Sequence, residues 1–192
     1  MRTLLFAALT ALTSSAFGQE PTSTDPPKPY ERVELVRVDS TRTADQLYRS
    51  ARRWFVDAFK DAEEVIQLED DSARTIVGKG WFNYHDMGRI WFTVEVAAKA
   101  GRYRVRFYNF NHVGVGGLTS GTTYVPYLDY GPIYAGAECY TPKPTLMIVE
   151  GTEKEMMLIH CAGIIQPLIK KECDAMVADL QRAMSSAGSS DW

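Results

Sequence analysis

The feature that most constrains the fold of this chain is a run of closely spaced strand patterns between Val65 and Phe110. Four segments in this run are rich in β-branched and aromatic residues, and only short turns separate them. They cover residues 64–69, 74–84, 89–99 and 102–110. Connections this short can join only antiparallel neighbours, and Ala100-Gly101 leaves room for a two-residue hairpin. The run therefore predicts an antiparallel sheet.

The alternation of residue types assigns faces to the last two of these strands. One set of apolar residues is expected to face the core: Ile90, Phe92, Val94, Val96 and Ala98, followed by Tyr103, Val105 and Phe107. Arg102, Arg104 and Arg106 alternate with the second group and are expected to face outward. Gly78 and Gly80 lie two residues apart on one face of their strand, which favours a bulge or the close approach of another element such as a helix.

Two helices flank the predicted sheet. A strand at 33–38 precedes the first helix, and Thr43 and Gln46 have the spacing of a capping box at its start. Its apolar residues recur at intervals of three and four and form one stripe: Ala44, Leu47, Tyr48, Ala51, Trp54, Phe55, Ala58 and Phe59. The second helix is expected from Pro167, with a face formed by Leu168, Ile169, Cys173, Met176, Val177, Leu180 and Met184. The predicted class is α+β, with both helices packed on one face of an antiparallel sheet.

The ends of the chain predict export. Residues 1–18 have the short positive start, the apolar centre and the small residues before a cleavage point that define a signal peptide. Residues 19–30 are expected to be a disordered spacer, 31–186 a single domain, and 187–192 a polar tail. A periplasmic or secreted location follows. No later apolar run is long enough for a transmembrane helix.

The composition argues against two classes of function. The formal net charge is −3, and binding to nucleic acid requires a concentrated basic face, so no nucleic-acid partner is expected. The histidines His85, His112 and His160 show no zinc-ligand spacing, and no serine has a nucleophile-elbow motif around it. No cofactor, metal or catalytic residue is therefore predicted, and the chain is expected not to be an enzyme.

The cysteines leave their pairing open. Cys139 could bridge Cys161 or Cys173 in an exported protein, while three buried and unpaired thiols are the alternative.

Residues 111–145 show no periodicity and are expected to form a long loop rich in Tyr and Gly. Segment 146–162 fits either a strand or a helix.

Several short motifs, taken in order, resemble one family. They are Leu47-Tyr48, Trp54-Phe55, Val65-Ile66-Gln67, Glu69-Asp70, Ile76-Val77-Gly78-Lys79-Gly80, Lys99-Ala100-Gly101-Arg102-Tyr103-Arg104, and Leu180 to Met184. Together they resemble the DUF4468 family, a domain of unknown function with a TBP-like fold found in exported proteins of Bacteroidetes. The resemblance implies a strand-helix-four-strand-helix order and supplies no catalytic residues. Ala100 replaces the family's acidic turn residue, and the long loop lies outside its pattern.

Non-enzymatic binding of a protein or envelope component is the favoured function. The candidate contact residues are Trp81 and Trp91 on the outer strand face, the stripe Arg102, Arg104 and Arg106, and the loop tyrosines Tyr124, Tyr127, Tyr130 and Tyr134. A solvated face with cross-strand pairs to residues such as Glu95 is the plain alternative for the arginines, and an ordered loop over the core is the alternative for the tyrosines. A second functional hypothesis is a small-amphiphile pocket between sheet and helices, lined by Phe92, Phe107, Met176 and Leu180.

Overall fold

The computed structural model describes residues 27–59, 65–84, 88–119, 123–136 and 161–186. The elements in chain order are β1 (Arg32–Arg37), α1 (Ala44–Phe59), β2 (Ile66–Asp70), β3 (Thr75–Asn83), β4 (Arg89–Lys99), β5 (Arg102–Thr119), β6 (Thr123–Pro132), a π-helical turn η2 (Cys161–Ile165) and α4 (Gln166–Ser186). The predicted order of strand, helix, four strands and final helix is confirmed, and β6 is an addition to it.

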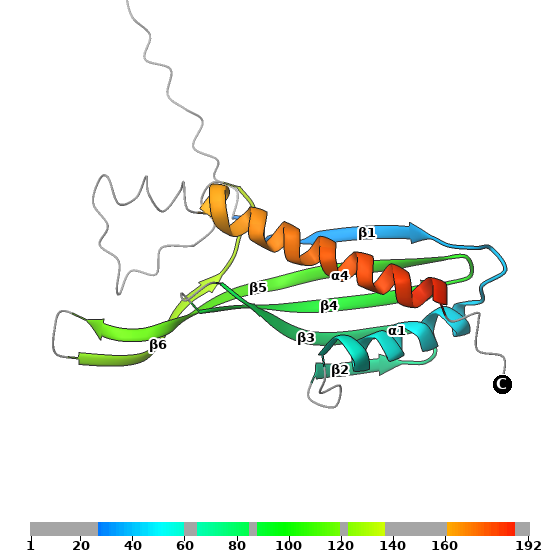
Figure 1. The fold of residues 1–192 in the computed structure, drawn as a ribbon, viewed down its shortest axis with the longest axis horizontal. Helices are drawn as coiled ribbons and strands as arrows, with labels where there is room; N and C mark the ends of the chain where they lie inside the picture. The colour runs from blue at the N-terminus through cyan, green and yellow to red at the C-terminus, as the bar shows by residue number, and fades with distance from the viewer. Residues whose placement is uncertain (1–26, 60–64, 85–87, 120–122, 137–160, 187–192) are drawn as a thin grey trace, which may run out of the picture.

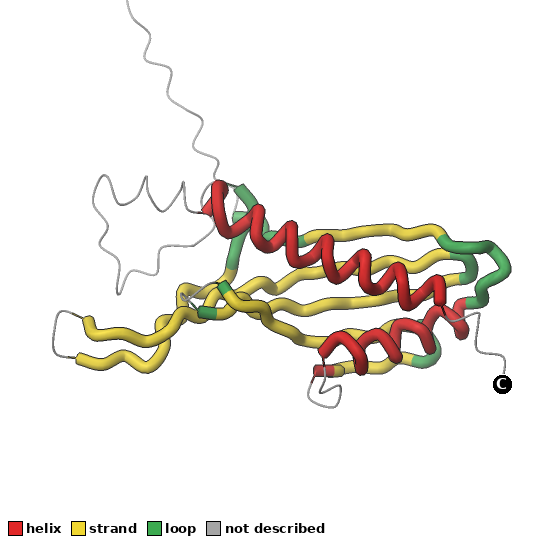
Figure 2. Tube along the Cα trace, viewed as in Figure 1, coloured by secondary structure: helices red, strands yellow, loops and turns green. Residues whose placement is uncertain are grey.

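The six strands form one sheet, and every pairing in it is antiparallel. The strand order is β1-β5-β4-β3-β2, and β6 pairs with the outer half of β5. Figure 1 shows α1 and α4 lying on the same face of this sheet, and Figure 2 shows the sheet as a single layer behind them. The α+β class with two helices on one face is therefore confirmed. No helix in the described ranges is long and apolar enough to cross a membrane.

The predicted capping box starts α1. The Thr43 amide donates to Gln46 Oε1 at 2.9 Å, and the Gln46 amide donates to Thr43 Oγ1 at 3.2 Å. These reciprocal bonds satisfy two amides that would otherwise lack partners at the helix start. The helix buries the middle of the stripe predicted from its spacing, with Trp54 and Phe55 at its centre, while Ala44 and Phe59 are half-buried and Ala58 is exposed.

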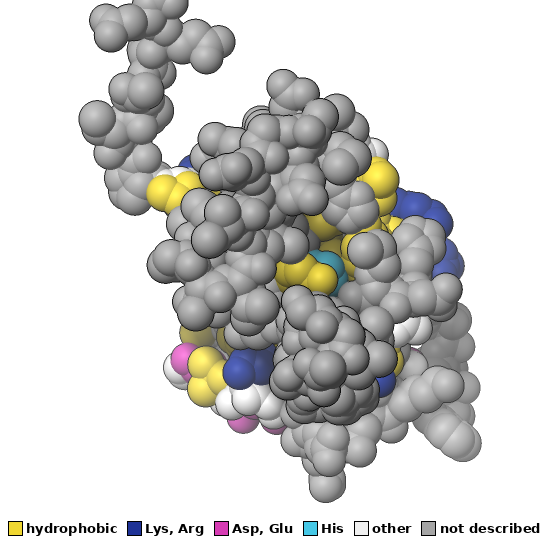
Figure 3. Space-filling model, turned by 90° about the vertical axis from the view of Figure 1, so that its left-hand side faces the viewer, with side chains coloured by type: hydrophobic (Ala, Val, Ile, Leu, Met, Phe, Trp, Pro, Cys, Tyr) yellow, Lys and Arg dark blue, Asp and Glu magenta, His cyan; other side chains and the backbone are white. Residues whose placement is uncertain are grey.

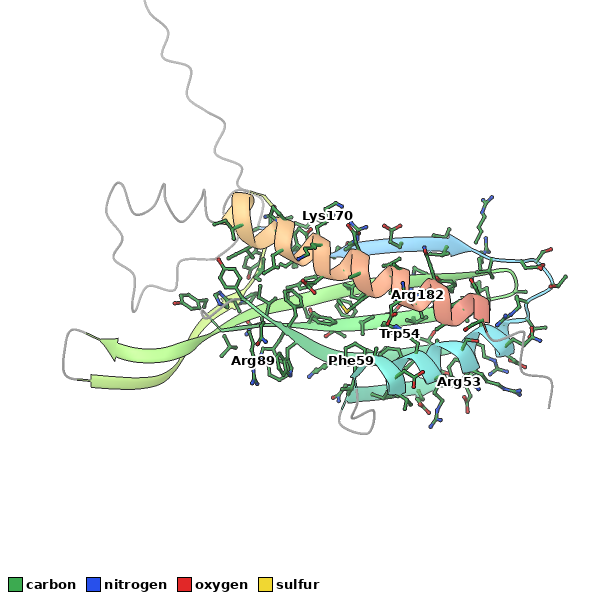
Figure 4. The ribbon with its side chains drawn as sticks, in the orientation of Figure 1. Arg53, Trp54, Phe59, Arg89, Lys170 and Arg182 are labelled. Atoms are coloured by element: carbon green, nitrogen blue, oxygen red, sulfur yellow. The ribbon has the colours of Figure 1, made fainter. Side chains whose placement is uncertain are left out.

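The core lies between the helices and the sheet. The inward residues predicted for β4 and β5 are all buried, and α4 contributes Ile169, Cys173, Val177, Leu180 and Met184. Trp54 is 5.0 Å from the ring of Phe55 and 5.6 Å from that of Phe59 in edge-to-face geometry. In Figure 4 the labelled Trp54 lies between α1 and α4, and Arg53 lies on the outer side of α1. The predicted apolar face of α4 is thus confirmed, and that of α1 is confirmed except at Ala58.

Gly78 and Gly80 are the points at which α1 approaches the sheet most closely. A Cβ built on Gly78 would lie 2.6 Å from Cε1 of Phe55, and one on Gly80 would lie 2.6 Å from Cε1 of Phe59. Any larger side chain would therefore overlap these rings. The predicted close approach by a helix is confirmed, and the glycines fix the height of α1 above the sheet.

The predicted long loop at 111–145 is wrong for most of its described part. Residues 111–119 continue β5, and Thr123–Pro132 form β6, so the chain builds a hairpin that projects beyond the helices (Figure 1). Asn109 has a φ of 54° and lies in a bulge opposite Phe92, where the inward set shifts from Phe107 to Phe110. Among the described residues no helix covers the hairpin, and the bulge shifts which residues point inward. The sequence of the hairpin therefore lacks the alternation of apolar and polar residues by which strands were predicted. Residues 137–145, and the ambiguous segment up to residue 160, lie outside the described residues.

The disordered spacer predicted to reach residue 30 ends earlier. The Tyr30 amide donates to the Ile133 carbonyl at 3.0 Å, and the Ala135 amide donates to the Lys28 carbonyl at 2.8 Å. The Tyr30 ring also packs edge-on against Phe110, with centroids 5.6 Å apart. An aromatic anchor and two backbone bonds therefore order residues 28–30 despite their polar, proline-containing sequence. The rest of the predicted spacer and the predicted signal peptide, up to residue 26, lie outside the described residues.

Candidate partner-binding face

The sheet face opposite the helices, called here the open face, carries most of the predicted contact residues. In antiparallel pairs, residues directly opposite each other point to the same side. Arg102, Arg104 and Arg106 stand opposite Arg37, Leu35 and Val33 respectively, and all six belong to this face. The open face also includes Glu95, Lys99, Arg89 and Trp91 of β4 and Val77, Lys79 and Trp81 of β3. The outward direction predicted for the arginine stripe is confirmed.

Trp81 and Trp91 form an exposed aromatic pair at one end of the open face. They are register partners on β3 and β4, with ring centroids 6.3 Å apart and planes inclined by 53°. Their exposed fractions are 42% and 39%, as the sequence pattern predicted for outward residues. The guanidinium carbon of Arg89 lies 3.9 Å from the Trp81 ring centroid, within cation–π range. Arg89 lies close to where the hairpin leaves the sheet (Figure 4).

A cluster of like charges occupies the other end of the open face. Arg102 stands directly opposite Arg37 on one side and directly opposite Lys99 on the other. All three side chains are exposed, and within the described ranges none of them forms an ion pair. Like charges placed opposite each other on a sheet are destabilising. This basic cluster is therefore unfavourable in the free protein and is suited to an acidic partner.

The other two predicted arginines are paired within the chain. Arg104 Nη2 lies 2.6 Å from Glu95 Oε1, and Arg106 Nη2 lies 2.8 Å from Glu31 Oε2. The bond to Glu31 raises the pKa of Arg106. Cross-strand pairing with Glu95, the plain alternative from the sequence, therefore holds for Arg104. These two arginines offer a partner less free charge than Arg102 does.

Two apolar residues on the open face were not identified from the sequence. Val33 and Leu35 of β1 are 49% and 60% exposed and flank the arginine stripe. The run Val33-Glu34-Leu35-Val36-Arg37-Val38 mixes apolar and charged residues at both parities, so the pattern does not assign a face. The inward side carries Arg32, whose guanidinium forms ion pairs with Glu34 and with Asp174 of α4. This α4 contact keeps the polar side of β1 toward the helices.

The predicted tyrosines lie on or near the hairpin, apart from the tryptophans and arginines. Tyr124 stands opposite Leu118 and Tyr127 opposite Val115 in the β5–β6 register. Tyr130 and Tyr134 are half-buried, and Tyr130 stacks on His112 with centroids 4.5 Å apart. His112 is 3% exposed and also meets the edge of Tyr84 at 5.3 Å. Figure 3 views the end of the molecule from which the hairpin projects, where a histidine side chain lies among hydrophobic side chains.

The pocket predicted between sheet and helices is occupied by the core itself. Phe92, Phe107 and Leu180 are at most 2% exposed, and the rings of Phe92 and Phe107 are 6.0 Å apart. Met176 is partly buried against the same cluster. Among the described residues no group of His, Cys, Asp and Glu side chains could hold a metal ion. Cys173 is a buried free thiol, and the side chains of Cys139 and Cys161 lie outside the described set.

Comparison with known proteins shows which family the core resembles. Residues 33–113 match the model of DUF4468, a domain of unknown function with a TBP-like fold, which confirms the resemblance noted in the sequence. A crystal structure of a DUF4468 family protein from Bacteroides ovatus ATCC 8483 is 15% identical, with a TM-score of 0.48, over 85% of this chain and 90% of that chain. A crystal structure of a TBP-like protein from Parabacteroides distasonis ATCC 8503 is 10% identical, with a TM-score of 0.47, over 81% and 92%. No curated protein matches the chain.

Proposed function

We propose that this chain is an exported, non-enzymatic binding domain that docks an acidic partner protein of the cell envelope on the open face of its sheet. The observation that carries the proposal is the joint exposure, on the sheet face opposite α1 and α4, of the Trp81–Trp91 pair and of the cluster Arg37, Lys99 and Arg102, which forms no ion pair in the described part of the chain. Export is supported by the signal-peptide pattern of residues 1–18.

The chemistry of the open face resembles that of a protein interface. Aromatic residues and arginine are enriched at such interfaces, and exposed Trp and Arg supply a large part of their binding energy. Val33 and Leu35 add apolar area beside the arginine stripe. The cluster of Arg37, Lys99 and Arg102 gives this end of the open face a local positive charge, although the formal charge of the whole chain is −3. Charge complementarity therefore favours an acidic partner.

A protein fits this face better than a nucleic acid does. Phosphate binding depends on many unpaired cationic side chains along one surface. Arg104 and Arg106 are already engaged by Glu95 and Glu31, whose carboxylates would also repel phosphates. An acidic protein segment can use the free cluster around Arg102 and place apolar groups against the tryptophans. Tyr124 and Tyr127 on the hairpin are additional proposed contacts.

The test is capture of a partner from the envelope fraction of the native host. Three baits are compared with the wild type: Arg102→Glu, the double variant Trp81→Ala/Trp91→Ala, and Arg53→Glu as a matched control on the outer side of α1. We expect a protein with an acidic segment, identified by mass spectrometry, to be retained by the wild type and the control and lost by both open-face variants. The same pattern must recur when the two purified proteins are mixed.

Two outcomes would overturn the proposal. Equal capture by all four baits would place any binding away from the open face. Capture abolished by nuclease treatment would identify a nucleic acid as the ligand instead of a protein. A Tyr127→Ala bait run in parallel would show whether the hairpin contributes, and a loss confined to that bait would move the interface from the open face to β6.

A further inference from the structure

The outer edge of β1 is an unpaired sheet edge in the part of the chain that the structure describes. β1 stands at one end of the strand order β1-β5-β4-β3-β2 and pairs with β5 alone. Its register with β5 runs without a break from Arg32 to Arg37. In Figure 1 β1 lies along the upper side of the sheet, and no further strand of the described residues lies beyond it. Such an edge presents a row of backbone N–H and C=O groups to which another strand can bond.

The hydrogen bonds of β1 to its neighbour show which of its backbone groups are at the free edge. The Val38 amide donates to the carbonyl of Gly101, its partner in the continued register with β5. In an antiparallel pair the backbone groups of successive residues point alternately toward the neighbour and away from it. The even-numbered residues of β1 therefore bond to β5. The N–H and C=O groups of Val33, Leu35 and Arg37 point the other way, toward the free edge.

The side chains along this edge leave apolar area and charge for an added strand to cover. Val33 and Leu35, on the open face, are 49% and 60% exposed. Arg37 stands opposite Arg102 on the same face and is exposed. On the helix side Val36 packs against the core but is only half-buried. A strand beside β1 would therefore bury apolar side chains on both faces and could neutralise Arg37.

β2, at the opposite side of the sheet, is protected against such pairing. It has five residues, and its register with β3 shifts between Ile66 and Leu68. The carboxylate of Glu69 is held by Arg52 of α1, at 2.9 Å. Short strands, bulges and charged side chains are the usual means by which proteins block pairing at a sheet edge. β1 has no bulge, so it is the better of these two edges for strand addition.

The charges along β1 favour an acidic partner over a second copy of the chain. Arg37 forms no ion pair within the described ranges. The acidic residues next to this edge are already engaged, Glu34 by Arg32 and Glu31 by Arg106. A second copy that paired through its own β1 would therefore bring no free acid to Arg37. An extended segment of another protein, with an acidic residue opposite Arg37, supplies one.

We propose that an extended acidic segment of the partner adds to β1 as a further, antiparallel strand, bonded to the backbone of Val33, Leu35 and Arg37. This inference rests on the proposed function and specifies its partner. Read from its N-terminus, the segment carries an acidic residue opposite Arg37, then apolar residues two and four positions later, opposite Leu35 and Val33. Backbone bonds give such a complex affinity, and the alternating side chains give it specificity. The antiparallel direction continues that of every pairing in the sheet.

The first test follows amide hydrogen exchange by NMR in the ¹⁵N-labelled protein, with a capped peptide of sequence Ser-Asp-Thr-Val-Thr-Val-Ser. We expect the amides of Val33, Leu35 and Arg37 to exchange quickly in the free protein. At peptide saturation they should exchange about tenfold more slowly or less, because they gain acceptors. The amides of Glu34 and Val36, bonded to β5, should exchange slowly in both states. Protection gained at alternate residues is specific to strand addition and needs no variant.

Matched peptides and variants then test charge, direction and the backbone bonds. The peptide with Lys in place of Asp, and the peptide in reverse order, should each bind about tenfold more weakly. Arg37→Glu should reverse the preference between the Asp and Lys peptides. Leu35→Pro removes an N–H at the free edge but no bond to β5, and should bind about tenfold more weakly than Leu35→Thr, which keeps that N–H. Arg53→Glu on α1 should bind as the wild type does, and melting curves check that each variant is folded.

Three outcomes would overturn the proposal. They are unchanged exchange of the edge amides at millimolar peptide, tighter binding of the reversed peptide, and a dimer of the free protein in sedimentation equilibrium that Leu35→Pro dissociates. The last of these would assign the edge to a second copy of the chain.

The capture experiment separates a failure of this inference from a failure of the proposed function. A partner retained by a Leu35→Pro bait and lost by the Arg102→Glu bait would dock on the open face without adding a strand, and only the strand addition would be wrong. Equal capture by the wild-type and Arg102→Glu baits would overturn the proposed function itself.

Discussion

Arg37 and Arg102 stand directly opposite each other on β1 and β5, both exposed and both on the open face. Lys99 stands opposite Arg102 on its other side, so Arg102 faces a like charge in each direction. Arg102→Glu converts both pairs into opposite-charge pairs. We expect it to raise the free energy of unfolding by a few tenths of a kcal/mol to about 1 kcal/mol, while abolishing capture of the acidic partner.

Urea unfolding in low salt measures this effect, and repeating it in 1 M salt should remove most of the gain, because exposed charges are then screened. Arg53→Glu on α1 is the control for adding an acid elsewhere. A destabilised Arg102→Glu variant would show that the basic cluster has a structural partner and is not an unfavourable arrangement kept for binding.

Alanine substitutions of the tryptophans should differ in their cost to stability, because Trp54 is buried in the core and Trp81 and Trp91 lie on the surface. Trp54 is 2% exposed and packs between the helices, so Trp54→Ala is expected to cost about 3–5 kcal/mol. Trp81 and Trp91 are partly exposed, and either alanine variant should cost less than about 1 kcal/mol. A double-mutant cycle on the Trp81–Trp91 pair, measured by urea unfolding, should give a coupling of about 0.5–1 kcal/mol. A cost above 2 kcal/mol at Trp91 would contradict its assignment to the binding surface.

The sequence predicts the helix-covered part of this fold well because burial is one-sided there. From Arg89 to Phe107 each strand has helices on one face and solvent on the other, so the period of two is clean. The capping box at Thr43 and Gln46 is a purely local signal and is confirmed for that reason. The glycines of β3 indicated a close approach, although not which rings would make it.

The sequence fails where the burial is not one-sided. The outer part of β5 and β6 projects past the helices, and the bulge at Asn109 reverses the parity of inward residues, so no pattern marks these strands. The face of β1 depends on the distant contact between Arg32 and Asp174, which spacing within β1 does not encode. The candidate site was therefore predicted at Trp81, Trp91 and Arg102 but missed at Val33, Leu35 and Arg37.

Gly80 should be intolerant of even a methyl group. A Cβ there would lie 2.6 Å from Cε1 of Phe59 and 2.9 Å from Cζ of Phe92. Gly80→Ala is expected to lower the free energy of unfolding by about 1–3 kcal/mol, because α1 must move or the rings must leave their rotamers. Chemical denaturation measures this cost, and Phe59→Leu in the same chain should recover part of it.

The control for this change is Gly163→Ala, where nothing lies within 4 Å of the added atom. It should be neutral or slightly stabilising. If Gly80→Ala matched it, α1 would not be held against β3 in the way that the close contacts indicate.

Alkaline pH should destabilise the protein through its buried thiol. Burial raises the pKa of Cys173 from its ordinary value of 9.0 to about 12. Between these values the unfolded chain has released the proton while the folded chain retains it, so raising the pH favours unfolding. The stabilisation that the protonated Cys173 thiol gives to the folded protein is complete below pH 9. Above pH 9 it should decline by about 1.4 kcal/mol per pH unit. Tyr103, whose pKa is also raised to about 12 by burial, adds a second decline above pH 10.

Urea unfolding at pH 8, 9 and 10 measures how the free energy of unfolding depends on pH. Cys173→Ala should make this dependence weaker between pH 9 and 10. The same thiol should resist a disulfide reagent at pH 8 in the folded protein and react on unfolding, since the thiolate is the reactive form. In a variant with Cys139→Ser and Cys161→Ser, Cys173 is the one thiol left to react with the reagent. Rapid reaction of Cys173 in the folded state would mean that α4 opens from the sheet readily, and both the pH slope and the buried position of this helix face would then be wrong.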